Sequence, residues 1–182
     1  RKALRDPPAP FVIVTGCYAQ RSPEAVAQMD GVGLFVGAEQ KLDIPPYPEA
    51  SSRPSAEARL VHGRTRDIHS FHLSSSSDER TRHFLKVQDG CDYHCSYCTI
   101  PKARGRSRNG SIASLVEESE RIVASGGREI VLTGVNIGDF GKGHPGDDFF
   151  ALVKALDKVE GIERFRIGSI EHNLPREENI RY

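Results

Sequence analysis

Three of the four cysteines lie close together in the chain, as Cys91, Cys95 and Cys98 with the spacing C-x3-C-x2-C. A disulfide-stapled secreted domain would distribute an even set of cysteines along the chain, because its bridges join distant segments. Clustered thiols instead indicate metal binding in a reducing compartment. The chain is therefore expected to fold around a loop that binds a metal.

A repeated strand and helix pattern surrounds this loop. The predicted elements are, in order, a strand at 84–87 that runs into Gly90 and the cysteines, a helix at 112–123, a strand at 129–133, a helix at 149–156 and a strand at 165–170. Ser114 and Glu117 have capping-box spacing, and glycines at 126–127 and 161 end the two helices. Repeated units of this length favour an α/β fold with a parallel sheet, either a partial barrel or an open doubly wound sheet. In both folds the chemistry gathers at the carboxyl ends of the strands.

The residues before this pattern divide into two further segments. A strand at 11–14, a helix from Ser22-Pro23 and a strand at 32–36 indicate the end of a small α/β domain. A Pro- and Ser-rich stretch follows, in which Leu60 to His62 could form a short strand. The expected boundaries are 1–45 for the C-terminal part of an N-terminal domain, 46–82 for a linker, and 83–182 for the first half of a second domain.

The net charge of the chain says nothing about a charged partner, but one short stretch of charged residues does. Lys plus Arg equal Asp plus Glu at 25 each, so no net field draws in a polyanion. Between Thr99 and Gly110, however, four cations occur without an acid: Lys102, Arg104, Arg106 and Arg108. Such a stretch is of the kind that meets phosphates, although, taken alone, a basic stretch is more often a solvated loop.

The chain shows no membrane or export signal. Its apolar runs fall far below the roughly 18 residues of a membrane helix, and no charged start precedes an apolar stretch. A soluble, cytoplasmic protein is expected. Because the sequence begins at Arg1 and ends at Tyr182 beside a new helical pattern, we also expect it to be part of a longer protein.

The cysteine loop leaves two kinds of metal site open. Thiolates suit zinc and iron–sulfur clusters. A structural zinc site usually has four ligands, for which His94 within the loop could serve as the fourth. Three cysteines without a fourth ligand would instead leave one iron of a cluster open to a small ligand.

The motif C-x3-C-x-Tyr-C at the end of a strand resembles the hallmark loop of the radical S-adenosylmethionine (SAM) superfamily. The segments VQDGCDYHCSYCTIPKARGRSR, EIVLTGVNIGDFG and RIGSIE resemble, in this order, the cysteine loop, second-strand loop and third strand of the methylthiotransferases that modify tRNA. The segment VTGCYAQ resembles the end of that family's N-terminal domain. The resemblance implies a partial parallel (β/α) radical SAM barrel preceded by the end of that domain.

The resemblance also implies roles for individual residues. Cys91, Cys95 and Cys98 would ligate a 4Fe-4S cluster whose open iron binds SAM, and Cys17 would be the last of three ligands of a second 4Fe-4S cluster. The residues implied in binding SAM are Tyr97 near the adenine, Gly134, Val135 and Asn136 near the amino group, and Ser169 and Glu171 near other polar parts. Tyr97 could also simply pack, Gly134 could form an ordinary turn, and Glu171 could be a surface carboxylate.

The implied reaction is the addition of a methylthio group to carbon 2 of a modified adenosine beside the anticodon of tRNA. An external electron donor reduces SAM, and the resulting 5′-deoxyadenosyl radical removes a hydrogen from the adenine. Relatives act on isopentenyladenosine, on N6-threonylcarbamoyladenosine or on an aspartate of a ribosomal protein, and ARGRSRN with LTGVNIGDFG favours the threonylcarbamoyladenosine branch. A rival hypothesis is a zinc-stabilised RNA-binding module without catalysis. This chain alone is expected to be inactive.

Overall fold

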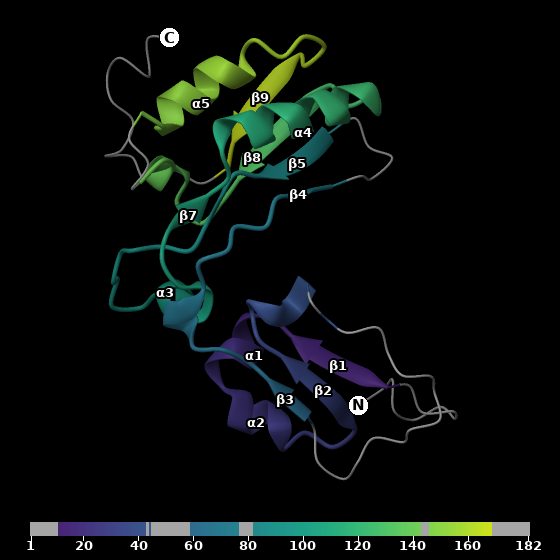
Figure 1. Cartoon of the computed structure of the whole chain (residues 1–182), viewed down its shortest axis with the longest axis vertical. Coiled ribbons are helices and arrows are strands. Elements are labelled where there is room, and N and C mark those ends of the chain that lie inside the picture. Colours follow the sequence, from purple (N-terminus) through teal and green to yellow (C-terminus); the bar gives the residue numbers. More distant parts are fainter. Residues whose placement is uncertain (1–10, 43, 45–58, 77–81, 143–145, 169–182) are drawn as a thin grey trace. The chain divides into compact units, whose positions relative to one another are not determined.

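The computed structural model describes residues 11–42, 44, 59–76, 82–142 and 146–168, and it divides the chain into two compact units (Figure 1). The first unit draws on residues 1–68 and 95–105, and the second on residues 69–94 and 106–182. One boundary falls between His94 and Cys95. The cysteine loop therefore belongs to both units, with Cys91 in the second and the other two cysteines in the first.

The first unit contains a three-stranded parallel sheet. Its strands are β1 (Val12–Thr15), β2 (Val32–Val36) and β3 (Arg59–Val61), in the spatial order β1-β2-β3. Every residue of the central strand β2 is buried, which explains why its sequence is apolar throughout and does not alternate. Phe35 packs with Ala19 and Val26 in the small core of this unit.

Short helices accompany this sheet. They are α1 (Cys17–Arg21), α2 (Pro23–Ala27), α3 (Ile100–Arg104) and the 3-10 turns η2 (Gln40–Leu42) and η3 (Thr65–Asp67). Gly16 has φ 114°, a value that favours glycine, and it lets the chain turn directly from β1 into α1. As expected from Ser22-Pro23, α2 begins at Pro23. Because α1 contacts α3, the segments that follow Cys17 and Cys98 pack together within this unit.

The second unit is built on a four-stranded sheet. Its strands are β4 (Ser74–Ser75), β5 (Arg82–Lys86), β8 (Glu129–Thr133) and β9 (Arg164–Ile167), in the order β4-β5-β8-β9. β4 pairs antiparallel with β5, and the other pairs are parallel. After β5, two strands of two residues each, β6 (Gln88–Asp89) and β7 (Arg108–Asn109), pair antiparallel and are called the β6–β7 hairpin below.

Two helices cover one face of this sheet. Figure 1 shows α4 (Ile112–Ala124) and α5 (Phe149–Leu156) on the same side of β5, β8 and β9. The core between the helices and the sheet consists of Leu85, Val87, Leu115, Ile122, Ile130, Leu132, Ile137, Phe140, Leu152 and Leu156. A doubly wound sheet would place helices on both faces, whereas strands that advance in one direction with helices on one side are typical of a barrel segment. The predicted α/β fold is confirmed.

Several local expectations differ from the structure. Ser111, and not Ser114, caps α4, because the Ser111 side chain accepts a hydrogen bond from the Ser114 N–H at 3.1 Å. The interval 46–82, expected to be a linker, contributes β3 to the first sheet and β4 to the second. β9 begins one residue earlier than expected, and residues 169 and 170 lie outside the described residues. No described helix has the length and apolar character needed to cross a membrane.

Candidate functional site

The β6–β7 hairpin holds the two ends of the cysteine-bearing segment together. Gln88 pairs with Asn109, and Asp89 pairs with Arg108. Directly after β6, Gly90 has φ +71°, and a Cβ atom at this position would overlap the carbonyl of Arg106. Only glycine fits this close backbone approach. The segment that carries the cysteines therefore leaves and re-enters the second unit at one fixed place.

The three loop cysteines carry thiols that form no disulfide within the described residues. Cys95 is exposed, and Cys91 and Cys98 are partly exposed. The Tyr93 N–H donates a hydrogen bond to Cys91 Sγ at 3.4 Å, and the Cys98 N–H donates to the Cys95 carbonyl at 3.1 Å. A backbone donor to sulfur is the kind of contact that tunes an iron–sulfur ligand.

No three His, Cys, Asp or Glu side chains of the described ranges are close enough to hold a metal ion. The donor set itself fits an iron–sulfur cluster, since three accessible thiols lie within eight consecutive residues, 91–98. Cys17, also free and exposed, is the first residue of α1 in the first unit.

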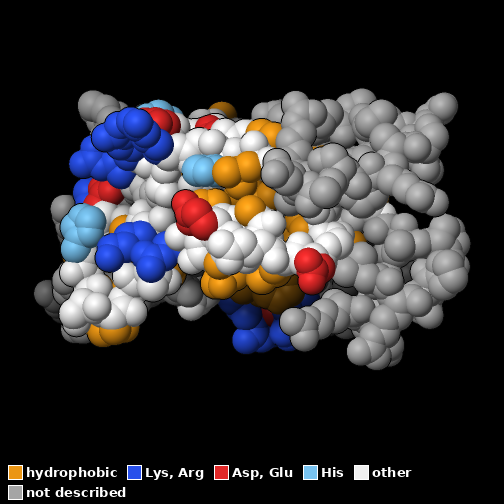
Figure 2. All heavy atoms as spheres, turned by 90° about the horizontal axis from the view of Figure 1, so that it is seen from below, with side chains coloured by type: hydrophobic (Ala, Val, Ile, Leu, Met, Phe, Trp, Pro, Cys, Tyr) orange, Lys and Arg blue, Asp and Glu red, His pale blue; other side chains and the backbone are white. Residues whose placement is uncertain are grey.

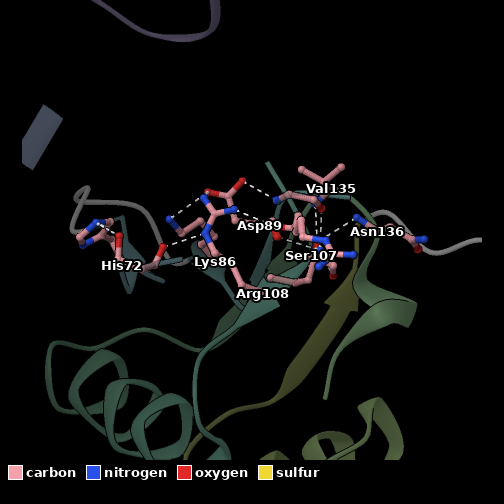
Figure 3. Close-up of polar contacts among 11 residues, drawn as sticks. His72, Lys86, Asp89, Ser107, Arg108, Val135 and Asn136 are labelled. Carbon is pink, nitrogen blue, oxygen red and sulfur yellow. Dashed lines mark hydrogen bonds and ion pairs between the residues drawn. The ribbon is translucent and has the colours of Figure 1, made fainter. Parts of the chain in front are cut away.

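A buried glutamine joins the hairpin to the loop after β8. Gln88 is fully buried, and its Nε2 lies 2.8 Å from the Gly90 carbonyl and 2.9 Å from Ser107 Oγ. Its Oε1 accepts hydrogen bonds from the N–H groups of Val135 and Asn136, both at 2.9 Å. Figure 3 labels three of the residues that Gln88 contacts, Ser107 directly before β7 and Val135 and Asn136 in the loop after β8.

The loop after β8 carries a buried amide without a partner. Asn136 is 4% exposed, and within the described part of the chain neither its Oδ1 nor its Nδ2 has a hydrogen-bond partner. A buried amide normally has a hydrogen-bond partner. An amide without one marks a place where a polar group of a ligand can supply the missing hydrogen bonds. Nearby, a Cβ on Gly134 would lie 2.9 Å from Ile137 Cγ1 and 3.0 Å from Gln88 Oε1, so a larger residue here would force the side chain of Ile137 or Gln88 to shift.

An ion-pair network connects the start of the cysteine loop to the same region. Lys142 Nζ lies 3.2 Å from Asp92 Oδ2 and 3.7 Å from Asp139 Oδ2. Burial opposes ionisation of Asp92, but the Ser107 N–H, Lys142 and Arg106 together lower its pKa. Burial raises the pKa of Asp139, and the two carboxylates raise the pKa of Lys142 despite its partial desolvation. Asp92, the residue after Cys91, is thus held as an anion.

The four loop cations have different environments. Lys102 and Arg104 lie exposed on α3. The Arg106 side chain is 83% exposed, 3.8 Å from Asp92, whereas the Arg108 side chain is only 14% exposed and contacts Asp89 at 3.4 Å and the Ser70 carbonyl at 2.7 Å. Arg108, which lies in β7, therefore links the β6–β7 hairpin to the segment at Ser70 within the second unit (Figure 3). Figure 2 shows Lys and Arg side chains at the left and at the lower edge of the face that it draws.

The remaining predicted residues are placed as follows. Tyr97 is 90% exposed, so it does not pack within the described chain. Ser169 and Glu171 lie outside the described residues.

The sequence analysis missed Gln88, Asp92 and Lys142. Gln88, an uncharged residue two positions before Gly90, carries no signal of its own. Asp92, the acid next to Cys91, was the one residue that could have indicated a cationic partner.

Comparison with known proteins gives two kinds of match. The profile of the Radical SAM superfamily matches residues 85–181, more than half of the chain. Over 94% of its length the chain is 35% identical to the threonylcarbamoyladenosine tRNA methylthiotransferase MtaB of Rickettsia prowazekii, and over 99% it is 34% identical to the protein of that name from Bacillus subtilis. It is also 31% identical, over 91% of its length, to the tRNA-2-methylthio-N(6)-dimethylallyladenosine synthase of Clostridium novyi. The chain spans only 40%, 40% and 37% of these relatives.

Proposed function

We propose, since this chain belongs to the radical SAM superfamily, that it contributes the cluster-binding half of a tRNA methylthiotransferase. Membership implies the use of SAM and an iron–sulfur cluster, and the resemblance to methylthiotransferases is confirmed. The observation that carries the proposal is the loop of three thiols outside any disulfide of the described residues, which follows β5 and is closed at its base by the β6–β7 hairpin. Ligands of parallel β/α folds bind at this end of the strands.

In this proposal Cys91, Cys95 and Cys98 hold a 4Fe-4S cluster. When bound, the cluster supplies the electron that cleaves SAM, and the protein binds, orients and shields the reactants. Asn136 offers its unpaired buried amide to a polar group of SAM, and Tyr97, Ser169 and Glu171 are further candidates for SAM binding. Cys17 belongs to a second cluster in the whole protein. An external electron donor and a cytoplasmic location, where thiols stay reduced, complete the proposal.

The proposed substrate is a tRNA that bears N6-threonylcarbamoyladenosine beside the anticodon. The two relatives of that name described above match 94% and 99% of the chain at 35% and 34% identity, while the dimethylallyladenosine synthase matches 91% at 31%. A threonylcarbamoyl group carries a carboxylate, so its pocket needs cations or hydrogen-bond donors, whereas an isopentenyl group prefers an apolar wall. Lys102 and Arg104, both exposed on α3, are the candidates to meet such anions.

Metal analysis of the anaerobically purified full-length protein tests the proposal. A cluster enzyme contains iron and sulfide and absorbs near about 400 nm, as thiolate-bound iron does. Stoichiometric zinc in a colourless protein would replace the proposal with the zinc-stabilised RNA-binding module.

Asn136→Leu should separate stability from cofactor binding. Leucine has a similar shape and removes two unpaired buried polar atoms, so we expect the cofactor-free protein to become more stable by about 1–3 kcal/mol. SAM affinity should fall at least about tenfold, since the buried donor and acceptor are lost. Denaturant unfolding and equilibrium SAM binding measure the two effects. Lower stability with unchanged SAM affinity would mean that Asn136 has only a structural role.

Replacing Lys102 and Arg104 together by Ala should weaken tRNA binding. Each lost phosphate contact should flatten the salt dependence, so the slope of log K against log salt should fall by about one unit per contact. Titrations of the full-length protein with tRNA at several salt concentrations measure the slope. Arg121→Ala is the matched control, because Arg121 is an exposed arginine of another helix, α4, where it pairs with Glu117 and Glu118. An equal slope for wild type and the double variant would contradict phosphate binding by α3.

A further inference from the structure

We propose that Gln88 is a positioning residue that holds the base of the cysteine loop, at Gly90 and Ser107, and the loop after β8 in a fixed relation to each other within the second unit. This inference rests on the proposed function, in which the first loop carries the cluster ligands and the second offers Asn136 to SAM. Gln88 carries an amide and no thiolate, both ends of that amide bond to protein groups, and the side chain is fully buried, so it acts through the groups that it holds.

The amide nitrogen of Gln88, Nε2, donates hydrogen bonds to both ends of the cysteine-bearing segment. Nε2 lies 3.1 Å from the Asp89 carbonyl, 2.8 Å from the Gly90 carbonyl and 2.9 Å from Ser107 Oγ. An amide nitrogen has two hydrogens, so the three contacts share them. Gly90 immediately precedes Cys91, and Ser107 also donates its N–H to Asp92 at 3.2 Å. The Gln88 amide therefore holds the point from which the first cysteine projects.

The acceptor end of Gln88 serves the loop after β8. Oε1 accepts the N–H groups of Val135 and Asn136, each at 2.9 Å, across 47 and 48 residues of sequence. A backbone N–H can only donate, so the atom that faces them must be the oxygen, and the orientation of the amide is unambiguous. Two adjacent N–H groups bound to one atom fix the backbone that carries the Asn136 side chain.

This site needs a donor for the Asp89 and Gly90 carbonyls and an acceptor for two backbone N–H groups, and the glutamine amide supplies both. Glutamate would keep the acceptor for Val135 and Asn136 but would turn a carboxylate oxygen toward the Asp89 and Gly90 carbonyls, which repel it. Methionine has a comparable length but leaves both backbone N–H groups buried without a partner. The two substitutions therefore disable different parts of the connection, one the donor end and the other both ends.

Hydrogen exchange on the cofactor-free, full-length protein tests the connection without requiring the proposed function. In Gln88→Met the Val135 and Asn136 amides should exchange at least about tenfold faster than in wild type, because each loses its acceptor. In Gln88→Glu these two amides should stay protected. Ser119→Ala is the matched control, since this buried hydroxyl bonds only the Leu115 carbonyl within α4, at 2.8 Å.

A second measurement follows SAM binding to the reconstituted protein. Gln88→Met should bind SAM about tenfold more weakly and lose the SAM-induced change in the electron paramagnetic resonance spectrum of the cluster. Ser119→Ala should change neither. Unchanged exchange in Gln88→Met, unchanged SAM affinity in that variant, or equal losses in Ser119→Ala would overturn the positioning role. Wild-type protein that binds neither iron nor SAM would overturn the proposed function instead.

Discussion

Full-length protein with Ala at Cys91, Cys95 or Cys98 is expected to lose its 4Fe-4S cluster and, with it, methylthiotransferase activity to the limit of detection. Each cysteine holds one iron, and two thiolates leave a cubane with two unprotected irons. Iron and sulfide content of anaerobically reconstituted variants, with the absorbance near about 400 nm, measures the loss.

Two controls make this result specific. Ser96→Ala changes a side chain within the same loop without removing a thiol, so it should keep the full iron content. Cys17→Ala should keep the SAM cluster, because Cys17 is proposed to serve the second cluster; the remaining cluster should still change its spectrum when SAM is added. Wild-type iron in all three loop variants would contradict the ligand set. Loss of all iron in Cys17→Ala would make Cys17 a fourth ligand, and the proposed open iron would not exist.

Transfer RNA from a strain that lacks the gene is expected to contain no 2-methylthio-N6-threonylcarbamoyladenosine, and re-introduction of the gene should restore it. The effect should be complete, because the methylthio group enters carbon 2 through one enzyme. Mass spectrometry of digested tRNA measures both modified adenosines in one sample. The 2-methylthio form of isopentenyladenosine should keep its wild-type level, since an isopentenyl group offers nothing to the cations that a carboxylate-binding pocket requires.

The complementing plasmid provides a sharper version of this experiment. Re-introduced Cys95→Ala protein should leave the threonylcarbamoyl product absent, whereas Ser96→Ala protein should restore it. Loss of the isopentenyl product from the deletion strain would instead assign the protein to the other tRNA branch. A deletion strain with both products intact would refute tRNA as the substrate.

Local chemistry made part of the site predictable. A thiolate can serve as a metal ligand, so Cys91, Cys95 and Cys98 could be named as candidate ligands from residue type and spacing, and this assignment stays a prediction. Apolar runs bounded by glycine also located β2 and β8 within their observed ranges. These signals depend on neighbours within a few residues, which the sequence displays directly.

The basic stretch shows where local chemistry is insufficient. Lys102, Arg104, Arg106 and Arg108 look alike in the sequence, and all four could be candidates for phosphate binding. The pairing of β6 with β7 brings Arg108 to Asp89, 19 residues earlier, and fixes it there. Because strand pairing joins residues that are far apart in sequence, the residues next to Arg108 in the sequence could not reveal that its guanidinium is paired with Asp89.

The amino-acid sequence by itself determined the chemistry that this chain can carry: clustered thiols, glycine at turns and strand–helix periods that select the α/β class. Only the tertiary structure decided which uncharged groups organise that chemistry. Gln88 acquires its role from Val135 and Asn136, 47 and 48 residues away, and Asn136 is conspicuous only because folding buries its amide without a partner. The physical reason is that donor and metal-ligand character are properties of a residue, whereas burial and hydrogen-bond satisfaction are properties of its surroundings.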